Sequence, residues 1–202
     1  MGALYHRCGV LKMIYILNKF ESNPYSGIEI DTTSRGRNKD LSPFFLGPVA
    51  TYVNGVMAQN VENLWQYSKV YPEFVDGVRI KNEYYEWRNK GWASEKAHRY
   101  PMGKGKIPLF ALWNSERCDY VLSRKRIYIP AYARMVKNTK SMWFIQEQLS
   151  QGRDVVLRDF DGYDFMKLGM TLRDVVNDPT RKMGHAFVIA MILNKCLDEC
   201  LA

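Results

Sequence analysis

Alternating apolar and polar positions predict short strands in both halves of the chain. Residues 12–18 and residues 27–32 each alternate around two isoleucines, and residues 154–159 hold an aliphatic run. Asn54-Gly55 separates two apolar segments within residues 49–58, which is a strong sequence signal for a hairpin. We therefore expect short strands and one tight hairpin.

Helical spacing of apolar residues covers more of the chain than strand alternation does. Asn60 is suited to cap the first helix, Pro130 is expected to break the third, and residues 186–193 are apolar on nearly all sides, as in a buried central helix. Helices are predicted over residues 61–74, 80–90 and 117–127, from Ser141 to Gly152, and from the Asp178-Pro179 cap to about Leu197.

Helices outnumber strands and the two mix irregularly, so we expect a helix-dominated α+β fold with a small sheet and a hairpin. A length of 202 residues suits a single domain, 1–202, with N-terminal strands and a loop over 1–40 and a core over 41–197. With 47% hydrophobic and 25% charged residues, the composition excludes wholesale disorder. No apolar run approaches the ~18 residues of a membrane span, and no secretory signal is evident, so we expect a soluble cytoplasmic protein with no membrane partner.

The net charge of +8 and the pI near 9.3 favour an anionic partner such as a nucleotide, another phosphorylated ligand or nucleic acid. A basic surface without such a partner remains an equal alternative. The four cysteines, at positions 8, 118, 196 and 200, lack metal-ligand spacing. We expect reduced thiols, no structural metal and no cofactor.

One polar stripe runs along the first predicted helix. Glu62, Gln66, Lys69 and Glu73 recur at helical spacing, opposite an apolar side that includes Leu64. The stripe fits a solvated helix face, which is the commoner case, or a polar lining of a pocket. In a pocket, packing around Glu62 would make its carboxylate a usable general base.

Two further segments carry candidate chemistry. The Gly/Lys-rich loop at residues 102–108 could wrap phosphate oxygens or be a flexible surface loop, and Trp113 beyond it could stack on a base or belong to the core. Residues 158–164 place three aspartates at a strand end, a pattern shared by magnesium sites and ordinary turns.

Several stretches resemble, in order, motifs of one family. They are a lead-in Leu41-Ser-Pro-Phe44, Val53-Asn-Gly-Val, Glu62-Asn-Leu-Trp-Gln-Tyr-Ser-Lys69, Met102-Gly, Pro108-Leu109 with Trp113, Val155-Val-Leu with Asp161-Gly-Tyr163, and Arg181-Lys-Met-Gly184. They are similar to the NADAR family of N-glycosidases, whose first helix reads Glu-His-x-x-Gln-x-x-Lys. The resemblance covers residues 41–195.

The chain departs from the family pattern at functional positions. Asn63 replaces the family's His, Asp164 stands in place of a Trp, and Arg181 in place of an Asn. Hydrophobic Val156 lies near the position where the family has a Glu. A different substrate, or loss of catalysis, would be consistent with these changes.

The resemblance implies hydrolysis of the bond between a base and a (phospho)ribose, including removal of ADP-ribose or a modified base from a nucleotide or nucleic acid. Such a transition state is oxocarbenium-like, so a carboxylate beside the anomeric carbon stabilises it and activates water. By the same resemblance, Glu62 and Asp161 are the candidate catalytic carboxylates. The candidate substrate-binding residues are Asn63, Gln66, Lys69, Lys104, Lys106, Trp113, Tyr163 and Arg181.

Two other functions remain open from the sequence. One is a non-catalytic protein that binds a nucleotide or ADP-ribose, and the other is a basic module that binds DNA or RNA. The expected partner is a phosphorylated nucleoside or an ADP-ribosyl substrate, with nucleic acid also allowed by the charge. The oligomeric state does not follow from the sequence.

Overall fold

The computed structural model describes residues 12–202, which form two compact units. The first unit contains residues 12–42 and 133–202, and the second contains residues 43–132. The predicted N-terminal strands thus belong with the C-terminal third of the chain, and the core expected over 41–197 is divided between the units. The α+β class is confirmed, with helices in the majority.

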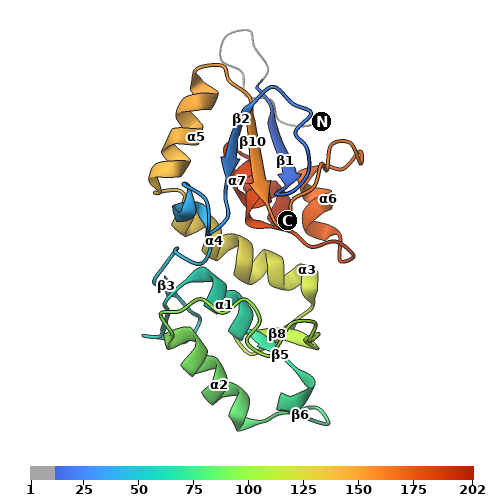
Figure 1. Cartoon of the computed structure of the whole chain (residues 1–202). Helices are drawn as coiled ribbons and strands as arrows, with labels where there is room; N and C mark the ends of the chain where they lie inside the picture. The colour runs from blue at the N-terminus through green and yellow to red at the C-terminus, as the bar shows by residue number, and fades with distance from the viewer. Residues whose placement is uncertain (1–11) are drawn as a thin grey trace. The chain divides into compact units, whose positions relative to one another are not determined.

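The first unit is built on a parallel three-stranded sheet, seen side by side in Figure 1. Its strands, in spatial order, are β1 (Ile14–Asn18), β10 (Val155–Asp159) and β2 (Ile28–Asp31). All five residues of β10 are buried, as expected for a central parallel strand. The three strands predicted from the sequence are confirmed.

Helices surround this sheet, and α7 (His185–Leu193) packs against β10 and β1. Eight of the nine residues of α7 are buried, which confirms the central helix predicted from its apolar composition. The others are α5 (Lys140–Ser150), α6 (Leu172–Asn177), α8 (Leu197–Leu201) and the 3₁₀ turn η1 (Lys39–Leu41).

The predicted start of the last helix is wrong. Asp178 accepts hydrogen bonds from the backbone and hydroxyl of Thr180 and so forms a local turn. Helix α7 begins seven residues later, and Asp159 caps it by accepting the Ala186 N–H over 3.0 Å. A cap supplied by a strand end elsewhere in the chain leaves no local signal in the sequence.

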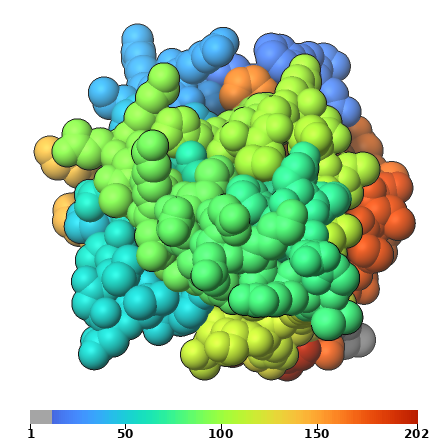
Figure 2. All heavy atoms as spheres, turned by 90° about the horizontal axis from the view of Figure 1, so that it is seen from below, coloured from blue at the N-terminus to red at the C-terminus, as the bar shows by residue number. Residues whose placement is uncertain are grey.

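The second unit contains the helices α1 (Val61–Tyr67), α2 (Asn82–Ala93) and α3 (Tyr120–Ser123), with small antiparallel sheets. The hairpin predicted around Asn54-Gly55 is confirmed as β3 paired with β4. The strands of this unit are β3 (Val49–Ala50), β4 (Met57–Ala58), β5 (Lys69–Val70), β6 (Val75–Asp76), β7 (Arg79–Ile80), β8 (Phe110–Trp113) and β9 (Glu116–Cys118), with the 3₁₀ turn η2 (Pro72–Phe74). Figure 2 views this unit from the side on which α2 and β6 lie in Figure 1.

The predicted helix over 61–74 ends early, at Tyr67. Ser68 Oγ donates to the Leu64 carbonyl over 2.7 Å, and the next two residues pair with β8. Pro72 disfavours a helical conformation at the residue before it, so the helix has a physical reason to stop before Tyr71. Glu73 therefore does not belong to the polar stripe and lies in η2.

The region from 117 to 136 also differs from the prediction. Residues 116–118 form β9, and the helix begins only at α3 (Tyr120–Ser123), capped by Asp119. Pro130 does not break it, because a π turn, η3 (Arg124–Tyr128), leads directly into α4 (Ile129–Val136). The π turn shifts the hydrogen-bond register just before the proline, which has no N–H to donate.

Along residues 12–202, no helix is long and apolar enough to cross a membrane.

Candidate functional site

The polar stripe of the first helix is a hydrogen-bonded chain of Glu62, Gln66 and Lys69, which we call the polar strip. Gln66 Nε2 donates to Glu62 Oε1 over 2.9 Å, and Lys69 Nζ donates to Gln66 Oε1 over 2.8 Å. Glu62 is 6% exposed and Gln66 is 8% exposed, while Lys69 is half-buried. The amide thus fixes the carboxylate at one end and receives the ammonium at the other.

Local sequence explains how the strip is positioned. Asn60 Oδ1 accepts the Asn63 N–H over 2.8 Å and caps the helix, which places Glu62 in the first turn of α1. A carboxylate in that turn is favoured by the helix dipole. Lys69 follows the end of the helix as the first residue of β5, and its ammonium lies 4.6 Å from the Trp65 ring centroid.

Asn63, a candidate substrate ligand, is fully buried and engaged with the backbone. Its Nδ2 donates to the carbonyls of Ser94 and Lys96, and its Oδ1 accepts the His98 N–H over 2.9 Å. Both amide protons are therefore used within the protein. Asn63 holds the segment that follows α2, a role for which its place beside Glu62 gave no indication.

Trp113, the candidate stacking residue, ends β8. Ala111, two residues earlier in the strand, pairs with Lys69. Because side chains alternate along a strand, the side chains of Trp113 and Ala111 lie on the same face of the sheet. The Trp113 ring meets Tyr52 edge-on, with centroids 4.9 Å apart. The pairing of β5 with β8 thus links Trp113 to the end of the polar strip.

The Gly/Lys loop lies at the surface of the second unit. Lys104 is exposed, and Lys106 Nζ forms an exposed ion pair with Glu73 Oε1 over 2.6 Å. Gly103 and Gly105 adopt positive φ angles of 103° and 89°, so the irregular loop predicted here is confirmed. Phosphate binding by the two lysines stays a prediction.

Asp161, Tyr163 and Arg181 belong to the first unit. The Asp161 N–H donates to Asp159 Oδ1 over 3.1 Å in the turn after β10. The Arg181 guanidinium lies 5.8 Å from the Tyr163 ring centroid, and its Nε is 3.6 Å from Asp178 Oδ2. The structure therefore brings Tyr163 and Arg181 together, as it brings Glu62, Gln66 and Lys69 together in the second unit.

Neither the pairing of Asp159 with His185 nor the surroundings of Arg88 was predicted from the sequence. Asp159 and His185 are both buried and lie 3.1 Å apart between Oδ2 and Nδ1. Arg88 is 5% exposed and lies among aromatic rings of α2 and Tyr52. The spacing of Tyr84, Arg88 and Trp92 by four residues was the available signal for the second cluster.

The described cysteines, at positions 118, 196 and 200, are free thiols. Cys200 Sγ donates to Cys196 Sγ over 4.0 Å, which lowers the pKa of Cys196 and raises the pKa of Cys200. Cys8 lies outside the described residues. Within residues 12–202, no group of three His, Cys, Asp or Glu side chains is arranged to hold a metal ion.

Comparison with known proteins adds one finding. A family model described as a family of unknown function, DUF6939, matches residues 17–189. Neither the curated proteins nor the solved structures contain a match to the chain. The matched segment includes the polar strip, β8, β10 and most of α7, and because it spans well over half of the sequence, the chain belongs to the DUF6939 family.

Proposed function

We propose that the protein is an N-glycosidase that hydrolyses the bond between a nitrogenous base and a (phospho)ribose. The polar strip carries this proposal. Glu62, Gln66 and Lys69 occupy the spacing of the Glu-x-x-x-Gln-x-x-Lys helix of the NADAR family, and they are hydrogen-bonded to one another in a buried place.

Because the strip is buried, a functional role explains its polar side chains better than a structural role does. Apolar residues at buried positions usually stabilise a fold as well as, or better than, a buried polar chain does. The solvated-face alternative requires exposure, but Glu62 and Gln66 are less than one-tenth exposed. A positioned carboxylate in a site shielded from water is what a cationic transition state needs.

The proposed step assigns Glu62 two tasks. Its negative charge stabilises the oxocarbenium character at the anomeric carbon as the C–N bond breaks, and its carboxylate accepts a proton from the attacking water. The water oxygen bonds to the anomeric carbon, and the departing base takes up a proton at its nitrogen. Gln66 keeps the carboxylate oriented, and Lys69 offers a cation for a substrate phosphate.

The remaining candidates of the second unit keep supporting roles in this proposal. Trp113, in the same unit as Glu62, would stack on the base, an interaction worth about 1–3 kcal/mol. Asp161, Tyr163 and Arg181 belong to the first unit, and the roles that the resemblance implies for them stay predictions. Lys104 and Lys106 would add positive charge at the surface loop.

The test is a substrate panel with the full chain. The protein is incubated with DNA carrying ADP-ribosylated guanine, with NAD, and with pyrimidine and guanine ribotides, and mass spectrometry follows release of the free base. We expect release from at least one of them. Calorimetric binding of a panel member without any released base would contradict hydrolysis and favour the non-catalytic binding protein.

A further inference from the structure

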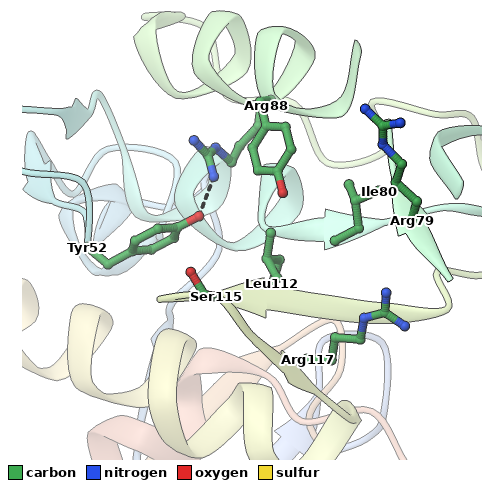
Figure 3. A pocket seen from close by; sticks show the side chains of 8 residues that line it. Tyr52, Arg79, Ile80, Arg88, Leu112, Ser115 and Arg117 are labelled. Carbon is green, nitrogen blue, oxygen red and sulfur yellow. Dashed lines mark hydrogen bonds between the residues drawn. The ribbon is translucent and has the colours of Figure 1, made fainter. Parts of the chain in front are cut away.

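The second unit contains a pocket of about 480 Å³ that the proposed hydrolysis does not use. Its lining comes from α2, from β7, from the β8–β9 hairpin and from the segment after β3, and Figure 3 shows the lining side chains. We call it the arginine pocket, and its lining residues are Tyr52, Arg79, Ile80, Tyr85, Arg88, Leu112, Ser115 and Arg117. Leu112 alternates along β8 with Ala111, the partner of Lys69, so the side chains of Leu112 and Lys69 lie on opposite faces of that sheet.

All charged residues that line the pocket are positively charged. Three arginines line it, at positions 79, 88 and 117, and no acidic residue does. Among residues 12–202, no carboxylate lies within ion-pair distance of any of these three guanidinium groups. The pocket therefore presents three positive charges that the protein does not neutralise, which favours an anionic ligand.

Arg88 is the most informative of the three, because it is almost fully buried without an acidic partner. Its guanidinium donates to the Tyr52 hydroxyl and to Asn89 Oδ1, and it lies 4.6 Å from the Trp92 ring centroid and 5.2 Å from that of Tyr85. Removing a cation from water without a counter-charge costs stability. An anion entering the pocket would offset that cost, and the rings hold the guanidinium plane in place for it.

Hydroxyl groups add uncharged donors to the pocket. The Tyr52 oxygen accepts from Arg88, which leaves its own proton available for a further acceptor. Burial raises the pKa of Tyr52, so this hydroxyl keeps its proton at neutral pH. Ser115 supplies a second, exposed hydroxyl from the turn between β8 and β9.

That turn is itself in an unfavourable conformation. Asn114 and Ser115 have φ angles of 48° and 65°, the left-handed pair of a two-residue hairpin, in which asparagine is favoured at the first position and glycine at the second. Such conformations carry a cost for residues with side chains and concentrate at ligand-binding positions. Ser115, at the second position, places a hydroxyl at the pocket that glycine would lack.

The shape of the lining indicates which anion fits. Ile80 and Leu112 lie between Arg88 at one end and Arg79 with Arg117 at the other (Figure 3). The Tyr85 ring lies against the Arg88 guanidinium. An apolar and aromatic wall between cations suits a flat ring that carries phosphate. A bare inorganic anion would use the guanidinium groups and leave this wall without a contact.

We propose that the arginine pocket is a nucleotide-binding site, in which the arginines hold the phosphates and the base lies against Tyr85, Ile80 and Leu112. This binding is distinct from the hydrolysis proposed for the polar strip, because no residue of the strip lines the arginine pocket. The proposal concerns binding alone and includes no chemical step.

Isothermal titration calorimetry of the full chain with ADP and with inorganic pyrophosphate tests it. We expect ADP to bind at least tenfold more tightly than pyrophosphate, because only ADP has a base to stack. Tyr85→Ala should weaken ADP binding about tenfold and leave pyrophosphate binding unchanged. Failure of ADP to bind, or equal affinities for ADP and pyrophosphate, would overturn the proposal.

A pair of matched double variants separates the pocket from general surface charge. Arg79→Gln with Arg117→Gln removes two exposed pocket cations, whereas Arg35→Gln with Arg37→Gln removes two exposed cations of the other unit. The first variant should lose at least tenfold in ADP affinity, and the second should stay within about twofold. Equal losses in the two variants would show that net charge, and not the pocket, binds the nucleotide.

Discussion

Asp159 Oδ2 and His185 Nδ1 lie 3.1 Å apart where the central strand β10 ends and helix α7 begins. The other ring nitrogen, His185 Nε2, lies 2.8 Å from the Thr32 carbonyl oxygen. The two ring nitrogens thus hold the imidazole between the Asp159 carboxylate and the Thr32 carbonyl. This pair joins α7, β10 and the residue that follows β2.

Replacing Asp159 with asparagine should destabilise the protein. The carboxylate accepts from the Ala186 and Asp161 N–H groups and from His185, and bonds to a charged group are worth about 1.5–3 kcal/mol each. We expect Asp159→Asn to lower the free energy of unfolding in urea by about 2–3 kcal/mol. Asp198→Asn, an exposed change in the same unit, should stay within about 0.5 kcal/mol of the parent. Equal urea midpoints for the two variants would refute the structural role of Asp159.

Gln66 should be needed for both stability and turnover. Gln66→Met keeps the side-chain length but removes the bonds to Glu62 and Lys69, which leaves buried polar groups without this partner. We expect a loss of about 1–3 kcal/mol in unfolding free energy, and slower release of the base. Gln146→Met, on an exposed position of α5, is the matched control. A variant as stable and as active as the parent would show that the strip is dispensable.

The two C-terminal cysteines should differ in reactivity. Because Cys200 donates to Cys196, the pKa of Cys196 is lowered, and the alkylation rate of Cys196 should reach its plateau at lower pH than that of an ordinary thiol. Cys200→Ala removes the donor and should move this profile to higher pH. Iodoacetamide pulses across about pH 6–10, read by peptide mass spectrometry, measure the shift.

Cys118 provides an internal comparison in the same samples. Burial raises the pKa of its thiol, so its alkylation should begin at higher pH than that of Cys196 and should not respond to Cys200→Ala. Overlapping profiles for Cys196 in the parent and in Cys200→Ala would contradict the assignment of Cys200 as the donor.

Local signals were enough to predict much of the fold. The alternation in β1 and β2, the aliphatic run of β10, the Asn54-Gly55 turn and the apolar α7 each follow from a few neighbouring residues. The errors arose where distant residues decide the structure. The start of α7 depends on Asp159, and the end of α1 depends on the pairing of β5 with β8.

For the candidate site too, local spacing predicted one part, and tertiary packing decides the rest. Helical spacing placed Glu62 and Gln66 on one face, and the structure adds that both are buried and that Lys69 reaches Gln66 from a strand. The arginine pocket could not be predicted in this way, because α2, β7 and the β8–β9 hairpin assemble it from separate parts of the sequence. Side chains that meet only through tertiary packing leave no spacing to detect.

The most direct test of the account compares base release by the parent protein, by Glu62→Gln and by Glu86→Gln, on whichever member of the substrate panel is cleaved. Glu62→Gln keeps an oxygen for the Gln66 amide but removes the negative charge, whereas Glu86 is an exposed residue of α2. The account predicts a loss of at least about 10²-fold for Glu62→Gln, and unchanged release for Glu86→Gln. Undiminished release by a folded Glu62→Gln protein would contradict it.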